Sequence, residues 1–365
     1  MTIEILDLKK RFKEEKHEIL KCVERVLKKG HLILTSEVQN FEESICKYTG
    51  SKYCLGVNSG TDALMMSLWS SGIKRGDEVI TSPISFIATA SSIIQLGAKP
   101  VFVDVNDDLN INPHLIERAI TKKTKAIMPV HWTGRVCDMD AILKIARKYN
   151  LIVIEDAAQA MGSYFKNKHA GTFGKISAFS VHPFKNLNAV GDGGFVITNE
   201  KKLYQKIKLY RNHGLQGRDN VKIIGVNSRL DSLHAEILNF RLKRLKNIIL
   251  RKKKNINYYK KFIKTSNVKI IEENKNERSS HSMFVTLCKN RDKLQKYLSH
   301  FKIETRIYYK TPLHLYHATK YLGFKKGDLP NAEKFSNQVL SLPYHQHLKK
   351  SEIEFVCKKI NDFYG

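Results

Sequence analysis

The stretch LIVIEDAAQAMG, residues 151–162, decides the fold of this 365-residue chain. Its first four residues are apolar, which is the pattern of a strand buried on both faces of a sheet. Glu155 and Asp156 end this strand, and a carboxylate at such a position is costly unless it has a partner. Gln159 follows three residues later and lies on the same side if the chain turns helical there. The alternative is that Asp156 caps a helix.

Six further short apolar segments flank this stretch and predict strands: residues 52–57, 78–82, 99–105, 125–130, 176–181 and 194–199. Segments with 3.6-residue periodicity separate several of them, for example residues 139–149. Strands that alternate with helices predict an α/β fold with a mainly parallel, seven-stranded sheet. In such sheets ligands bind beyond the carboxyl ends of the strands, so functional residues are expected there.

The sequence becomes rich in Lys and Asn after about residue 245, which predicts two domains. Residues 1–245 are expected to form a large α/β domain, and residues 246–365 a smaller α+β C-terminal domain. In the small domain, residues 282–288 and 303–309 predict strands, and a helix is expected after Ser351. Near the start of the chain, the apolar stripe of residues 8–29 predicts an amphipathic helix.

The composition is typical of a globular protein and argues against a membrane protein, an exported protein and a cysteine-bound metal site. The chain has 63 Lys+Arg against 35 Asp+Glu, a formal charge of +28, and 42% hydrophobic residues, as in globular proteins. No apolar run is long enough to cross a membrane, and the first twenty residues are too charged for a signal peptide, so we expect a cytoplasmic protein without a membrane partner. None of the six cysteines pairs at CxxC spacing, so no metal site is predicted.

The densest basic segment, residues 241–261, holds ten Lys/Arg and no acid. Its leucines and isoleucines recur at near-helical spacing, which favours an amphipathic helix with a solvated basic face over a nucleic-acid surface. No DNA- or RNA-binding motif accompanies it, so we expect no nucleic-acid partner. A basic field would equally suit a small phosphorylated substrate.

Two other strand ends carry residues suited to chemistry. VNSGTDAL, residues 57–64, could present backbone N–H groups and the hydroxyls of Ser59 and Thr61 to a phosphate, or could be only a capping turn. In SAFSVHPFKNLNAVGDGG, residues 177–194, Lys185 follows a buried strand, with Ser180 and His182 just before it. A lysine in a dry pocket has a lowered pKa and can form a Schiff base, whereas most lysines of a lysine-rich chain are solvated.

A third segment, YRNHG followed by GVNSRLD within residues 210–231, brings an Asn, a Ser and an Arg close together before a helix. These side chains could hold an anion or could cap structure, and their spacing leaves both readings open. A phosphate cradle, a carboxylate for a pyridinium nitrogen and a nucleophilic lysine on an α/β sheet are together what pyridoxal 5′-phosphate (PLP) needs.

The same segments resemble the successive motifs of the DegT/DnrJ/EryC1/StrS aminotransferases: NSGTDAL, SPISFIATA, GAKPVFVDV, IEDAAQAMGS, AFSVHPFKN with GDGG, RNHG and GVNSRLD. ETRIYYKTPLHLY (304–316) and LSLPYHQHL (340–348) resemble that family's small-domain motifs. The resemblance covers essentially the whole chain. It implies the aspartate-aminotransferase-like fold (PLP fold type I) and a homodimer whose active sites are shared between subunits.

The resemblance also implies roles for single residues. Lys185 would hold PLP as a Schiff base, Asp156 would pair with the pyridine nitrogen, and Gln159 would lie by the phenolic oxygen. The phosphate would be bound by Ser59, Gly60, Thr61 and Ser180, and by Asn227 from the partner subunit. Phe86 would stack on the ring, the alternative being ordinary core packing. Substrate contacts are expected from His182, Arg211, His213, Arg229, Tyr308 and His314.

The implied activity is transamination, because Lys185 stands where a related dehydratase branch has His. The amino group would pass from glutamate or glutamine to a keto sugar, in the main hypothesis a nucleotide-linked keto-deoxysugar for surface polysaccharide or glycan biosynthesis. An alternative acceptor is a phosphorylated or acidic small keto compound, such as a keto-sugar acid or a triose phosphate. A third hypothesis, a non-enzymatic cofactor-binding regulator, requires the Lys185 constellation to be vestigial.

Overall fold

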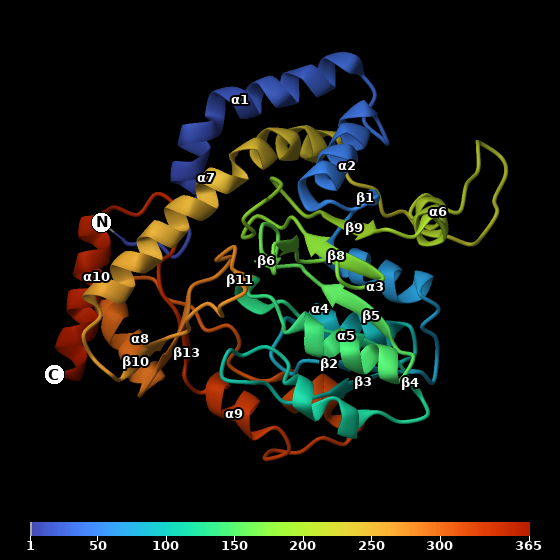
Figure 1. Ribbon diagram of the computed structural model, residues 1–365. Coiled ribbons are helices and arrows are strands. Elements are labelled where there is room, and N and C mark those ends of the chain that lie inside the picture. Colours follow the sequence, from blue (N-terminus) through green and yellow to red (C-terminus); the bar gives the residue numbers. More distant parts are fainter. Residues whose placement is uncertain (1) are drawn as a thin grey trace.

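A seven-stranded sheet forms the centre of the structure, a computed structural model that describes residues 2–365 (Figure 1). The strand order is β1-β9-β8-β5-β4-β2-β3. Every neighbouring pair is parallel except the two made by β9, which runs antiparallel to both β1 and β8. The prediction of a mainly parallel seven-stranded sheet is therefore confirmed. The strands are β1 (Tyr53–Val57), β2 (Glu78–Thr81), β3 (Lys99–Phe102), β4 (Thr124–Met128), β5 (Ile152–Asp156), β8 (Ile176–Ser180) and β9 (Gly194–Thr198).

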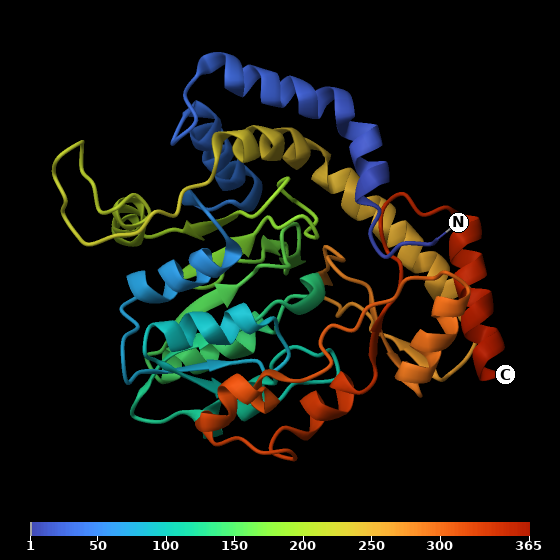
Figure 2. The same ribbon diagram turned by 180° about the vertical axis from the view of Figure 1, so that it is seen from behind.

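Helices cover both faces of this sheet, which explains why its strands are apolar without alternation. Along β5, Val153 packs with α2 (Ser36–Thr49), α5 (Met139–Lys148) and the first half of α7 (Ser232–Phe262), whereas the next residue, Ile154, packs with α3 (Gly60–Ser70), α4 (Ile87–Gln95) and α6 (Lys201–Tyr210). Figure 2 shows the face of the sheet that α3 and α4 cover. The predicted amphipathic helix is α1 (Leu8–Lys29), which lies along α7.

The C-terminal part of the chain, for which a smaller α+β domain was predicted, contains both helices and strands. Its antiparallel sheet joins β10 (Val268–Ile270), β12 (Val285–Cys288) and β13 (Val339–Ser341), and its helices are α8 (Arg291–His300), α9 (Pro330–Ser336) and α10 (Lys350–Tyr364). The predicted strand at residues 303–309 is wrong, because only isolated bridges form there, at Ile303 and Arg306. The two-residue strands β6 (Tyr164–Phe165), β7 (Lys168–His169) and β11 (Glu277–Arg278) make a third sheet that we did not predict.

Helix α7 joins the two parts of the molecule, and it runs continuously through the predicted domain boundary at residues 245/246. Leu245 belongs to the core of the large sheet, whereas Ile256, three turns later, belongs to the core of the C-terminal unit. Ile3 and Ile5 also pack into that C-terminal core. Figures 1 and 2 both show α7, in yellow, passing from the sheet to the red C-terminal helices. A division into two domains stays a proposal, with the change of core along α7 in its support.

The described helices include none that combines the length and the apolar character needed to cross a bilayer.

Candidate active site

A cavity of about 320 Å³ opens at the carboxyl ends of the central strands, where ligands were expected. Asp156 is the last residue of β5 and Ser180 the last of β8, and these strands are neighbours. Ten of the residues predicted to bind cofactor or substrate line this cavity: Ser59, Gly60, Thr61, Phe86, Asp156, Gln159, Ser180, His182, Lys185 and Tyr308. They come from five separate segments of the chain, so the fold alone brings them together.

The N-terminus of α3 forms one end of the cavity. Ser59 caps this helix, since its Oγ accepts a hydrogen bond of 3.0 Å from the Asp62 N–H, and it also lines the cavity. A Cβ on Gly60 would lie 2.7 Å from the Cβ of Ser180, so only glycine lets the helix start approach β8 this closely. The free N–H groups and the positive end of the helix dipole fit a phosphate.

Asp156 is buried and also lines the cavity. Its carboxylate accepts a hydrogen bond of 2.6 Å from the Thr89 hydroxyl and one of 3.2 Å from the Ala158 N–H. Burial raises the pKa of this carboxyl, and the bond from Thr89 and the charge of Lys185 oppose the rise. The expected helix after Asp156 does not form: residues 158–159 make a turn, and the bond from the Ala158 N–H belongs to that turn. The alternative that Asp156 caps a helix is therefore wrong, and its carboxylate lines the cavity. Thr89 was missed, although it lies within the quoted segment SPISFIATA.

Lys185 lies on the turn after β8, where its own N–H donates to the His182 carbonyl at 2.8 Å. Burial lowers the pKa of its ammonium to about 8, and the Asp156 carboxylate opposes this change. An amine with such a pKa is neutral in a useful fraction near neutral pH and can act as a nucleophile. Lys185 is therefore unlike the solvated lysines that dominate this chain.

Aromatic side chains form the remaining wall. Phe86 is 57% exposed and lines the cavity, which excludes the alternative that it is an ordinary core residue. Tyr308 was predicted, whereas Tyr309 and Tyr344 were missed because nothing in their local spacing marks them. Burial raises the pKa of all three tyrosines, so their hydroxyls stay protonated and can donate hydrogen bonds at neutral pH.

Two residues predicted to contact substrate, Arg211 and His314, do not line this cavity. Arg211 is buried and donates to Glu42 Oε1 at 2.5 Å and to the Gly56 carbonyl at 2.6 Å, so its guanidinium ties α2 to β1. His314 is also buried, with its Nε2 3.1 Å from a Glu333 oxygen. Neither side chain lines the cavity, because internal partners already occupy both.

Three further predicted residues lie on or beside the segment that follows α6 and projects from the body in Figures 1 and 2. His213 and Asn227 are exposed, and Arg229 donates to Asn212 Oδ1 at 3.1 Å. Their own chain's cavity does not include them.

The donor set of the cavity fits PLP. The α3 N-terminus suits its phosphate, the buried carboxylate of Asp156 suits a protonated ring nitrogen, and the desolvated amine of Lys185 suits its aldehyde. Gln159 is held beside them, since its Oε1 accepts a 2.7 Å bond from the Thr133 N–H. A sequence model of the DegT/DnrJ/EryC1/StrS aminotransferase family matches residues 13–361.

This chain belongs to the DegT/DnrJ/EryC1/StrS aminotransferase family.

Individual members of the DegT/DnrJ/EryC1/StrS family are similar along their whole lengths. A "pleiotropic regulatory protein" of Geobacillus stearothermophilus is 38% identical over 368 residues, covering 100% of this chain and 99% of its own. The dTDP-3-amino-3,6-dideoxy-alpha-D-galactopyranose transaminase of Aneurinibacillus thermoaerophilus is 38% identical over 363 residues, 99% of each chain. The crystal structure of S. venezuelae DesV in complex with a ketimine intermediate superposes with a TM-score of 0.96, at 34% identity, covering 99% of this chain and 98% of that one.

Proposed function

We propose that this chain is a PLP-dependent aminotransferase that moves an amino group from glutamate or glutamine to the keto group of a nucleotide-linked keto-deoxysugar. The observation that carries the proposal is the desolvated Lys185 amine, which shares one cavity with the buried Asp156 carboxylate and the open N-terminus of α3. The membership of the chain in an aminotransferase family supports the same reaction.

The choice of acceptor rests on the relatives. The A. thermoaerophilus relative is named for a dTDP-linked sugar, which favours a nucleotide sugar over a small phosphorylated or acidic keto compound. The charge of +28 suits either acceptor, because both are anions. The G. stearothermophilus relative carries a regulatory name, but the chain belongs to an aminotransferase family, and a non-enzymatic regulator would not explain the desolvated amine of Lys185.

Bound PLP supplies an electron sink for the charge that develops when the donor loses its α-proton. The protein's own groups would hold and serve it. The N–H groups at the start of α3, with Ser59, Thr61 and Ser180, would bind the phosphate. Asp156 would keep the ring nitrogen protonated. Lys185, held by the turn after β8, would accept the donor's α-proton at its Nζ and deliver it to the cofactor carbon that takes over the amino group, and with the acceptor it would move a proton in the opposite direction.

The aromatic wall would exclude water from the reacting atoms. Phe86, at the N-cap of α4, would cover one face of the cofactor ring, and its exposed ring is free to do so. The protonated hydroxyls of Tyr308 and Tyr309 would orient the sugar, because they can donate to its hydroxyl or carbonyl oxygens.

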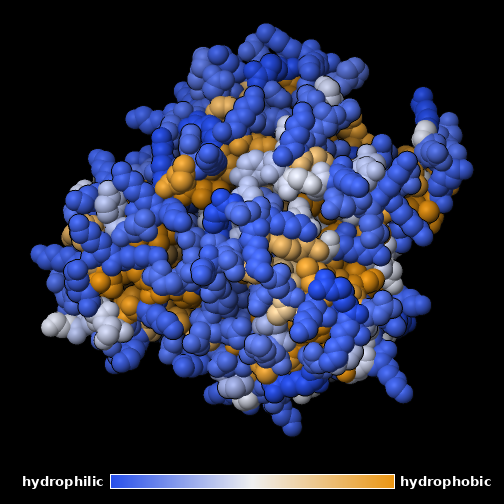
Figure 3. Space-filling view, viewed as in Figure 1, coloured by the Kyte–Doolittle hydropathy of each residue, from blue (hydrophilic) through white to orange (hydrophobic). Residues whose placement is uncertain are grey.

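The active enzyme would be a homodimer in which Asn227 reaches the phosphate bound by the partner subunit. In support, Asn227 is exposed and lies outside its own chain's cavity, on the projecting segment. The same segment carries Val221 and Ile224, of which Ile224 is 88% exposed, a side chain that a monomer would leave in water. Figure 3 shows apolar atoms within this projection, at the right of an otherwise mostly hydrophilic face. We also propose a cytoplasmic location and no nucleic-acid partner.

A screen of acceptors tests the proposed reaction. The protein is first converted with glutamate to its amino form, and keto compounds of the two classes are then added while the cofactor spectrum is followed. A nucleotide-linked keto sugar should restore the original spectrum rapidly, and Lys185→Ala should abolish the response. Rapid restoration by a small keto acid or triose phosphate alone would overturn the acceptor assignment.

A further inference from the structure

Lys252 is a buried lysine that the proposed mechanism does not use. It lies on α7 and is only 3% exposed, and its Nζ donates a hydrogen bond of 2.7 Å to Asn186 Oδ1. The same Nζ lies 4.7 Å from the centre of the Tyr344 ring, which lines the cavity. Burial lowers the pKa of this ammonium to about 7. Burying a lysine amine costs free energy because the amine loses its hydration. We therefore expect the contacts of Lys252 to have a structural or functional role.

Asn186, the acceptor, follows Lys185 directly in the chain and is also buried. Its Nδ2 donates to the Ser280 carbonyl at 2.7 Å. Because the Ser280 carbonyl can only accept, the nitrogen of the Asn186 amide must face Ser280, and its oxygen then faces Lys252. The residue that shares a peptide bond with Lys185 is thus held from two sides.

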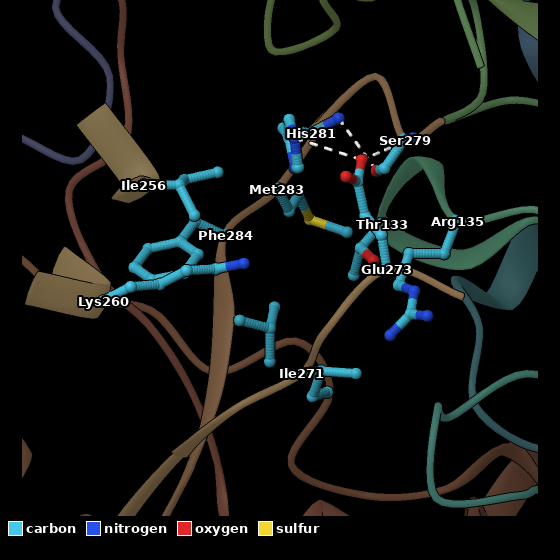
Figure 4. A pocket seen from close by; sticks show the side chains of 11 residues that line it. Thr133, Arg135, Ile256, Lys260, Ile271, Glu273, Ser279, His281, Met283 and Phe284 are labelled. Carbon is cyan, nitrogen blue, oxygen red and sulfur yellow. Dashed lines mark hydrogen bonds and ion pairs between the residues drawn. The ribbon is translucent and has the colours of Figure 1, made fainter. Parts of the chain in front are cut away.

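Ser280, which accepts the hydrogen bond from Asn186, also contacts Gln159, another residue that lines the cavity. Its Oγ donates to the Gln159 carbonyl at 3.3 Å, and its N–H donates to Ser163 Oγ at 3.1 Å. The preceding residue, Ser279, donates its N–H to Glu273 Oε1 at 2.8 Å, as drawn in Figure 4 beside a small cavity of about 40 Å³. The segment that receives Asn186 is therefore fixed itself.

Helix α7 holds the far end of the same turn through Arg241. This buried guanidinium donates to the Asn188 carbonyl at 2.8 Å and to the Ala189 carbonyl at 3.1 Å. Of the two cations of α7 that hold the turn, Lys252 is the one that contacts the neighbour of Lys185.

We propose that Lys252 is a positioning residue for Lys185: through Asn186 it fixes the turn that carries the nucleophile and keeps the Lys185 amine in its desolvated place. The inference rests on the proposed function in one respect, since it takes Lys185 as the reactive lysine. Lys252 touches neither the reacting atoms nor the cavity itself.

The test measures the reactivity of Lys185 in the cofactor-free full-length chain. Competitive labelling with an amine reagent across pH, with mass spectrometry of the Lys185 peptide, gives the labelling midpoint. The variants are Lys252→Met, Asn186→Ala, their double mutant and Lys252→Arg. Lys254→Met, an exposed lysine of the same helix, is the matched control. Thermal unfolding of each variant reports folding separately.

Lys252→Met and Asn186→Ala should each raise the labelling midpoint from about 8 by about one pH unit or more, because a loosened turn rehydrates the amine. The double mutant should shift the labelling midpoint no further than either single mutant, since both substitutions remove the same Lys252–Asn186 hydrogen bond. Lys252→Arg, which keeps a hydrogen-bond donor, and the control Lys254→Met should both retain the labelling midpoint of the wild-type protein. If Lys252→Met fails to fold, Asn186→Ala carries the same test.

Two results would overturn the inference. One is an unchanged midpoint in folded Lys252→Met and Asn186→Ala. The other is a shift in Lys252→Met alone, which would mean that the charge of Lys252 acts directly and not through Asn186. Failure of the proposed function looks different, because wild-type protein would then capture no PLP on Lys185, whatever the labelling midpoints of the variants.

Discussion

Asp156 ends β5 and Lys185 lies on the turn after the neighbouring strand β8, and each influences the charge of the other. Burial favours the neutral form of both groups, so it lowers the pKa of the lysine and raises the pKa of the carboxyl. Their mutual attraction opposes both changes. A protonated ring nitrogen of the cofactor would give the carboxylate another cation to pair with, and Lys185 would then be stabilised less in its protonated form.

The lowered pKa of Lys185 predicts how PLP capture depends on pH. Below about pH 8 the amine is mostly protonated, so the rate of capture by the cofactor-free protein should fall about tenfold for each unit of pH. Above about pH 8 the neutral amine dominates and the rate should level off, well before the ordinary lysine value of 10.5. Stopped-flow absorbance measures this rate, and a midpoint near 10.5 would contradict the desolvation of Lys185.

Asp156→Asn preserves the shape of the carboxyl but removes its charge. We expect turnover to fall by about 10²-fold or more, because an amide does not stabilise a protonated ring nitrogen. Thr89→Val should have a smaller effect in the same direction, since it removes one hydrogen bond to the carboxylate. Steady-state kinetics with glutamate decide the point, and unchanged turnover in Asp156→Asn would remove this carboxylate from the reaction.

Two helices position the residues of the site: α3 through its N-terminus, and α7 through contacts along much of its length. The start of α3 supplies the proposed phosphate cradle, and its approach to β8 depends on a glycine. Helix α7 carries residues of both cores and the two cations that hold the lysine turn. We therefore expect α7 to be continuous, because a break would separate the residues that pack into the two cores and hold the turn that carries Lys185.

Gly60→Ala should weaken the cradle, because its Cβ would meet the Cβ of Ser180 at 2.7 Å. Overpacking of this kind costs about 1–3 kcal/mol, so the Kd for PLP should rise by about tenfold or more. Equilibrium titration gives the Kd, and chemical denaturation gives the stability of the cofactor-free variant. Tight PLP binding by a well-folded Gly60→Ala protein would show that the phosphate is held elsewhere.

Leu250→Pro tests the continuity of α7 beyond the predicted domain boundary. Leu250 is 53% exposed, so the substitution removes little buried surface but should destabilise the helix by about 3 kcal/mol or more. Leu250→Ala is the control and should change the free energy of unfolding by less than about 0.5 kcal/mol. Equal stability of the two variants would mean that the chain does divide near residue 245.

For the whole molecule, the sequence predicted the sheet and the residues around the cavity well, for physical reasons. Buried parallel strands are continuous apolar runs, so all seven could be located from residues such as LIVI, and the strand ends then indicated Asp156 and Lys185. The positions of Arg211 and His314 away from the cavity were not foreseen, because spacing does not reveal their internal partners, Glu42 and Glu333. Tyr309 and Tyr344 lie within the quoted segments 304–316 and 340–348, but the position of a tyrosine in such a segment does not reveal that its side chain reaches the cavity. The two-residue strands are too short to show a periodic pattern.

The proposed dimer predicts complementation between two inactive variants. Lys185→Ala removes the nucleophile, and Asn227→Asp would place a negative charge against the partner subunit's phosphate. If sites are shared, a mixed dimer has one site with both lesions and one with neither, so up to about half of the normal activity per site should return after subunit exchange. No recovery, with exchange confirmed by native mass spectrometry, would place both residues in the site of one subunit.

The proposed reaction requires that Lys185 binds PLP covalently. Borohydride reduction of the purified protein, followed by digestion and mass spectrometry, tests it most directly, because reduction makes the bond between lysine and cofactor permanent. We predict a single modified peptide in which Lys185 carries the phosphopyridoxyl group, and no such peptide from Lys185→Ala. Modification of a different lysine, or of none in protein saturated with PLP, would contradict the account.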